Sequence, residues 1–199
     1  MIIETLGDQE LQQFRVLDLP VVDGQPTEII EVWQGQIGIT HPKDPKLLIT
    51  SVGASSCTPL VGHSEFASFV LHPDYETDVL GTLEEYLAAL PSLLNAPKTG
   101  KFSLYLDGNA SERSSELIKR IKSVPARIAG YELRLIAEDV LNVPTSRALD
   151  IGIDSRTGKL FWYSLPLVGV DKSRSGLHPS QYGDRIAVLT YPYRTRSLA

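Results

Sequence analysis

The sequence predicts an α+β protein in which mixed or antiparallel β-sheet layers, arranged like a β-sandwich, carry helices packed on the outside. Short runs of alternating or apolar side chains recur between turn residues, a pattern typical of strands. Two segments, 77–94 and 111–124, instead show the apolar spacing of amphipathic helices. A chain of 199 residues is long enough for one domain with a sizeable core.

The expected strands are bounded by loops and turns rich in Gly, Pro, Asp and Ser. They cover 28–39 (one or two strands), 47–52, 65–73, 101–108, 131–140 and 185–191. Residues 147–165 read as a hairpin around the Ser155–Gly158 turn, because two alternating runs flank it. The stretch between Cys57 and Glu65 is expected to be a connecting loop.

The first helix is expected to start at Thr77 or Asp78, since both side chains are good N-caps. Pro91 should end or bend it, because proline cannot donate the helical hydrogen bond. In the second helix one face is apolar, and Ser111 is the expected cap. That face consists of Leu117, Ile118 and Ile121.

Charge and composition narrow the classes of partner. The formal net charge is −5, so no basic field is present to hold nucleic acid. No apolar stretch has the length of a membrane span, and the first residues lack the pattern of a signal peptide. A cytoplasmic location is therefore expected. An effector delivered into a host cytoplasm by a specialised secretion machine would have the same sequence features.

The chain contains one cysteine, Cys57, at the junction of an apolar run and the Thr58–Pro59 turn signal. A single cysteine excludes an intramolecular disulfide framework and a Cys-rich zinc site. Its position suits a side chain that is presented for chemistry. A thiol acts as a nucleophile in its thiolate form, so a catalytic Cys57 needs a base nearby.

Two histidines follow the cysteine closely. His72 lies fifteen residues after Cys57 on the next expected strand, where Ser68, Val70 and His72 share one face. His63 lies in the expected loop and is the alternative base. Ser51 offers a hydroxyl that could orient the imidazole.

Simpler interpretations compete with catalysis. Cys57 could be an inert buried residue, and the histidines could be ordinary surface residues. Cys57, His63 and His72 could also hold a metal, although their spacing is irregular and a fourth ligand is missing. We therefore expect neither a metal nor a cofactor.

Taken together, these segments resemble CheD, the bacterial chemoreceptor glutamine deamidase. SVGASSC (51–57) is similar to its T-x-G-L-G-S-C element, which carries the nucleophile. FASFVLHPDY (66–75) resembles the strand with its histidine, and residues 135–165 resemble the element that closes its domain. The Cys–His core also resembles that of cytotoxic necrotizing factor and Burkholderia lethal factor 1, toxins that deamidate a glutamine of a host protein.

The resemblance implies a protein glutamine deamidase in which Cys57 is the nucleophile, His72 (or His63) the base and Ser51 its orienting residue. The implied partner is a protein that bears the target glutamine, in chemotaxis or in virulence. Two alternatives stay open: another Cys–His hydrolase or transglutaminase, and a non-catalytic binding or regulatory module on the same fold. The expected organisation is one domain, 1–199, with a deamidase-like core at 30–165 between an N-terminal (1–29) and a C-terminal (166–199) extension.

Overall fold

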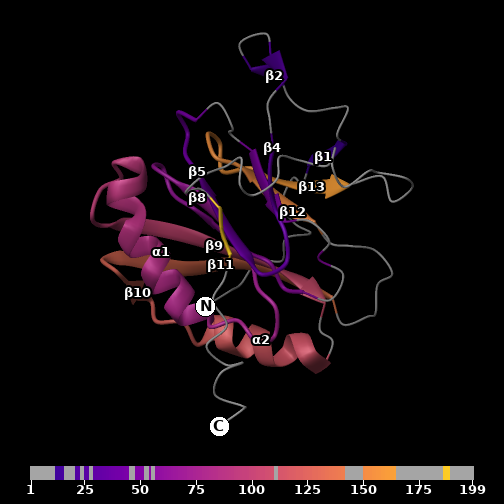
Figure 1. Cartoon of the computed structure of the whole chain (residues 1–199). Coiled ribbons are helices and arrows are strands. Elements are labelled where there is room, and N and C mark those ends of the chain that lie inside the picture. The colour runs from indigo at the N-terminus through magenta and orange to yellow at the C-terminus, as the bar shows by residue number, and fades with distance from the viewer. Residues whose placement is uncertain are drawn as a thin grey trace.

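The computed structural model shows two mixed β-sheets and two α-helices (Figure 1). The structure describes residues 12–15, 21–22, 25–26, 29–44, 48–51, 54, 57–109, 112–141, 150–164 and 186–188. Within these residues the α+β class and the sheet layers expected from the sequence are confirmed.

The larger sheet has seven strands in the order β10-β11-β9-β7-β8-β5-β14. Their bounds are β5 (Gln36–Thr40), β7 (Leu60–His63), β8 (Ser68–His72), β9 (Gly100–Asn109), β10 (Arg127–Ile128), β11 (Tyr131–Leu141) and β14 (Ile186–Val188). β9 and β11 run parallel, whereas β7 is antiparallel to both β8 and β9. The central strands β7 and β8 therefore form a hairpin within the sheet.

The smaller sheet has five strands in the order β1-β13-β12-β6-β4. These strands are β1 (Gln12–Arg15), β4 (Ile29–Val32), β6 (Leu48–Ser51), β12 (Ile151–Asp154) and β13 (Leu160–Ser164). β12 and β13 form the predicted antiparallel hairpin. A separate two-stranded pair joins β2 (Val21–Val22) to β3 (Gln25–Pro26).

Helices α1 (Val79–Leu94) and α2 (Glu112–Lys122) lie together on one side of the seven-stranded sheet (Figure 1). The Asp78 carboxylate accepts the Gly81 N–H at 3.1 Å, which confirms Asp78 as the cap of α1. Pro91 does not end α1, which continues to Leu94, the last residue of the expected helix. Of the described helices, neither is long and apolar enough to cross a membrane.

Two apolar layers hold the fold together. The outer layer joins the helices to one face of the seven-stranded sheet, and includes Phe69, Leu71, Leu83, Leu87, Phe102 and Leu117. The inner layer joins the other face to the five-stranded sheet, and includes Ile30, Val32, Ile49, Val61, Val70, Tyr105, Ile151 and Ile153. Because strand side chains alternate, Ser68, Val70 and His72 all face the inner layer. The face that these three residues share thus lies between the two sheets.

Most expected strands are found with shifts of a few residues at their ends. The segment 28–39 forms two strands, β4 and β5, which a turn with Gly35 at φ 78° connects. The main error concerns residues 60–63. They form the central strand β7, where a loop was expected. Only four residues long and interrupted by Gly62, this strand has too little alternation to be recognised.

Each sheet contains a glycine directly opposite a phenylalanine. Gly62 pairs with Phe69, and a Cβ at Gly62 would overlap the Phe69 ring. Gly152 pairs with Phe161, and a Cβ there would meet both that ring and the Ile49 carbonyl oxygen, the latter at 2.6 Å. The two rings therefore occupy space that only glycine leaves open.

We expect Gly62→Ala to lower the free energy of unfolding by about 1–3 kcal/mol, because the ring must move within a packed layer. Adding Phe69→Leu should recover part of that loss, since the branched side chain is smaller than the ring. The matched pair Gly152→Ala and Gly152→Ala/Phe161→Leu should show no recovery, because the Ile49 carbonyl remains in place. Urea unfolding of the single and double variants measures both couplings, and equal recovery at the two sites would contradict the assignment.

Candidate functional site

The candidate site lies at the end of the sandwich where β8 finishes and β7 begins. Leu60 pairs with Leu71, and Val61 pairs with Val70. Continued by one residue, this register places Pro59 opposite His72, with Cys57 two residues further on. The hairpin therefore brings Cys57 and His72 to the same end of the sheet.

Residues 57–59 continue along the end of β9. The Asp107 N–H donates to the Pro59 carbonyl oxygen at 3.1 Å. A Cβ at Gly108 would lie 3.0 Å from the Thr58 Cα and 3.1 Å from the Cys57 carbonyl oxygen. The missing side chain of Gly108 thus allows β9 to approach the Cys57 backbone closely, which fixes the course of the chain beside the thiol residue.

His72 is fully buried on the inner face of β8. Its Nδ1 lies 3.1 Å from the Val32 carbonyl oxygen at the end of β4, a strand of the opposite sheet. Nε2 is buried and has no hydrogen-bond partner among the described residues. One ring nitrogen is therefore anchored across the two sheets, and the other is left without a proton donor or acceptor.

The anchor determines where the proton sits. A carbonyl oxygen only accepts, so Nδ1 carries the hydrogen, and in the neutral ring Nε2 then bears the lone pair. Burial lowers the pKa of His72 to about 4, against a smaller upward effect of the Val32 hydrogen bond. At neutral pH the resting imidazole is therefore uncharged and is a proton acceptor at Nε2.

Cys57 is also buried, with 6% of its surface exposed, and forms no disulfide. Thr58 beside it is fully buried, and its Oγ1 has no hydrogen-bond partner among the described residues. A small adjustment of this segment is needed before a large substrate can reach the sulfur, since nearly all of its surface is covered.

The structure corrects the role expected for Ser51. Its hydroxyl lies 3.3 Å from the Ile151 carbonyl oxygen, to which it donates, and accepts the Ile151 N–H at 3.0 Å. These bonds connect β6 to β12. The His72 imidazole is bonded instead to the carbonyl oxygen of Val32, the residue of β4 that pairs with Ser51. The orienting group therefore comes from the neighbouring strand, and it is a backbone carbonyl.

The loop between β6 and Cys57 has a second attachment to β12. The Ala54 N–H donates to the Asp150 carboxylate at 3.0 Å, and both residues are buried. The Gly53–Cys57 turn that was expected to expose backbone amides lies mostly outside the described residues; of it, the structure describes Ala54 and Cys57.

His63 lies away from Cys57. It is at the far end of β7, six residues along the extended chain, or about 20 Å. Its Nδ1 lies 2.8 Å from the Ser68 Oγ. Gly158 packs against the other side of the ring, where a Cβ would come within 2.7 Å of Nε2. The structure thus brings His72, and not His63, to the end of the sheet that carries Cys57.

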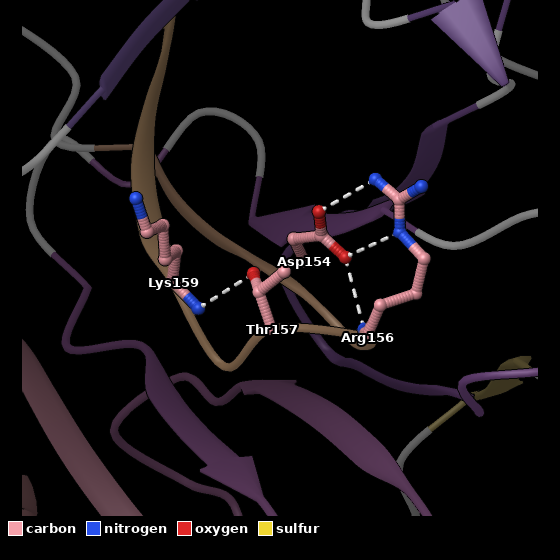
Figure 2. Close-up of polar contacts among 4 residues, drawn as sticks. All are labelled: Asp154, Arg156, Thr157 and Lys159. Carbon is pink, nitrogen blue, oxygen red and sulfur yellow. Dashed lines mark hydrogen bonds and ion pairs between the residues drawn. The ribbon is translucent and has the colours of Figure 1, made fainter.

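The turn that faces His63 contains a close Asp154–Arg156 pair. The Asp154 carboxylate accepts from the Arg156 backbone N–H at 2.9 Å and from its guanidinium at 3.1 and 2.8 Å (Figure 2). Burial lowers the pKa of His63, and the charge of Asp154 partly opposes this. His63 therefore joins β7 to the β12–β13 turn, which is a structural role.

The three residues considered as metal ligands do not come together, because His63 is separated from Cys57 and His72 along β7. Across the described segments, no group of three or more His, Cys, Asp and Glu side chains could hold a metal ion. No protein-family model matches the sequence, and no curated protein matches it.

Sequence reasoning missed two groups of this site. Val32 acts through its carbonyl, and a backbone group has no signature in the sequence. Asp150 and Ala54 are 96 residues apart in the sequence, so their hydrogen bond depends on how the strands pair in the folded protein. The motif around Cys57 and the strand with His72 were the parts that the sequence could indicate.

Proposed function

We propose that the protein is a cysteine-dependent protein glutamine deamidase, in which Cys57 is the nucleophile and His72 the general base. The observation that supports this most is the state of His72. Its Nδ1–H is held by the Val32 carbonyl, its ring is neutral, and its unpartnered Nε2 lies at the end of the sheet that carries the thiol residue. A base needs this tautomer and this charge before it accepts a proton.

In the proposed reaction, Nε2 of His72 accepts the Cys57 proton as the sulfur attacks the carboxamide carbon of a glutamine side chain. The tetrahedral oxyanion collapses to a thioester, and the imidazolium gives its proton to the leaving ammonia. Water then loses a proton to Nε2 and attacks the thioester. The imidazolium returns that proton to the sulfur, which leaves a glutamate side chain on the partner and the free thiol on the enzyme.

This scheme differs in one respect from a resting thiolate–imidazolium pair. With a pKa of about 4, His72 is neutral before substrate binds, so the ion pair forms during the attack. The Val32 carbonyl stabilises the imidazolium once it forms, because the Nδ1–H that it accepts becomes more acidic. No step requires a metal or an organic cofactor.

The burial of Cys57 favours one second candidate, a binding or regulatory module that does no chemistry. In that case His72 and Cys57 would be packing residues between the sheets. A transglutaminase differs from the first proposal only in the second half-reaction, where an amine replaces water. One experiment separates the three: the deamidase forms glutamate, the transglutaminase an amine adduct, and the binding module no product.

The purified protein is incubated with bacterial and animal-cell protein extracts in heavy-oxygen water, with and without an added primary amine. We expect a small set of glutamines to become glutamates that carry heavy oxygen in the side chain, in the wild type and not in Cys57→Ala. Peptide mass spectrometry measures this. Dominant incorporation of the amine would assign a transglutaminase, and identical labelling by the two proteins would contradict the enzymatic proposal.

A further inference from the structure

The start of β12 holds the chain before Cys57 at two points. The Ile151 backbone is bonded to the Ser51 hydroxyl, and the Asp150 carboxylate is bonded to the Ala54 N–H. These attachments are three residues apart, and Cys57 follows three residues after the second. Ser51 and Ala54, which precede the thiol residue, are therefore bonded to the start of β12 in the five-stranded sheet, whereas His72 belongs to the seven-stranded sheet.

We infer that Asp150 is a positioning residue of the proposed site: its carboxylate holds the Ala54 amide, three residues before Cys57. This inference rests on the proposed cysteine chemistry, which it deepens. Asp150 acts here through Ala54 and is not a residue that touches substrate.

Burial makes this contact strong. Asp150 is 4% exposed and Ala54 is fully buried, so water does not replace a lost partner. An amide bonded to a carboxylate is a charge-assisted pair, stronger than one between neutral groups. When a buried N–H loses its acceptor, the whole cost of its desolvation is left uncompensated. The segment should then move to find another partner, and Cys57 should move with it.

The charge of Asp150 and its hydrogen-bond acceptor are expected to affect the thiol differently. A negative charge disfavours a nearby thiolate, so removal of the charge alone should not lower reactivity. Removal of the acceptor should lower reactivity, because the sulfur leaves its place relative to His72. Asp150→Asn keeps an acceptor oxygen without the charge, and Asp150→Ala removes both.

The experiment uses the full chain and two readouts. The first is hydrogen exchange of the Ala54 amide, which we expect to be about tenfold faster in Asp150→Ala, the equivalent of one lost hydrogen bond. The second is the rate of Cys57 alkylation by iodoacetamide at pH 6, which we expect to fall about tenfold or more in Asp150→Ala and to stay within about threefold of wild type in Asp150→Asn. Glu132→Gln, an exposed carboxylate paired with Lys101, is the matched control.

Unchanged Ala54 exchange in Asp150→Ala would overturn the inference. Equal loss of alkylation in Asp150→Asn and Asp150→Ala would also overturn it, because a retained hydrogen-bond acceptor would then not preserve reactivity. If Asp150→Ala does not fold, Asp150→Ser takes its place, since its shorter side chain does not span the same distance. If alkylation of wild-type Cys57 has the pH dependence of an ordinary thiol, the proposed function is wrong. Hydrogen exchange of the Ala54 amide would still show whether Asp150 holds Ala54.

Discussion

In His72→Gln, the rate of Cys57 alkylation by iodoacetamide is expected to fall about a hundredfold between pH 7 and pH 5. An isolated thiol behaves in this way, because its thiolate fraction drops about tenfold for each pH unit below the pKa. In the wild type we expect the rate to change less than about threefold over the same range, because His72 receives the proton. The wild-type rate should decline only as the pH falls through about 4, where His72 itself becomes protonated.

The glutamine in this variant is similar in size to histidine and keeps polar amide N–H groups, while the imidazole base is lost. His63→Gln is the matched control, because His63 lies at the other end of β7 and should leave the profile of the wild type unchanged. Intact mass confirms that a single thiol is labelled. If wild type and His72→Gln share the steep profile, Cys57 and His72 do not act together, and the binding module becomes the better assignment.

The same imidazole should make the fold sensitive to acid. The pKa of His72 is about 4 in the folded protein and near 6.5 in the unfolded chain. Between these values the unfolded chain binds the extra proton, so the stability that His72 contributes is complete above pH 6.5 and is lost as the pH falls to about 4. The difference corresponds to a loss of about 3 kcal/mol in the free energy of unfolding.

Carboxylates titrate in the same range, so the comparison between variants isolates the histidine. The free energy of unfolding is measured with urea at several pH values. Between pH 6.5 and 4 it should decrease by about 3 kcal/mol less in His72→Gln than in the wild type. Parallel curves for the two proteins would show that the folded protein accommodates a charged His72, and the neutral resting base would have to be abandoned.

Much of the fold could be predicted from local pattern. Alternation located β9 and β11, helical spacing located α1 and α2, and the Ser155–Gly158 turn located the β12–β13 hairpin. Local pattern failed at β7, where four residues with a central glycine form the middle of the larger sheet. Their strand is imposed by the neighbours β8 and β9, which no nearby residue signals.

The candidate site was predictable only in part, for a related reason. Cys57 and His72 were expected to come together because two sequential strands often pair. The strand before Cys57, β6, lies in the other sheet, and β8 pairs instead with β7, which follows Cys57. The Val32 carbonyl joins His72 across the two sheets and over 40 residues, and this contact exists only after the sheets have packed. The hydroxyl of Ser51 was a plausible orienting group by type, and its position in the smaller sheet, beside β12, directs it elsewhere.

The attachment of Ala54 to Asp150 also bears on how the molecule matures. A ribosome that has synthesised the chain through β11 has already made Cys57, His72 and Val32, but not the carboxylate that holds the Ala54 amide. Contacts over such separations form late, because the entropy of closing a long loop must be overcome first. We therefore expect that, in nascent and partly folded chains, Cys57 has not yet reached its final position relative to His72.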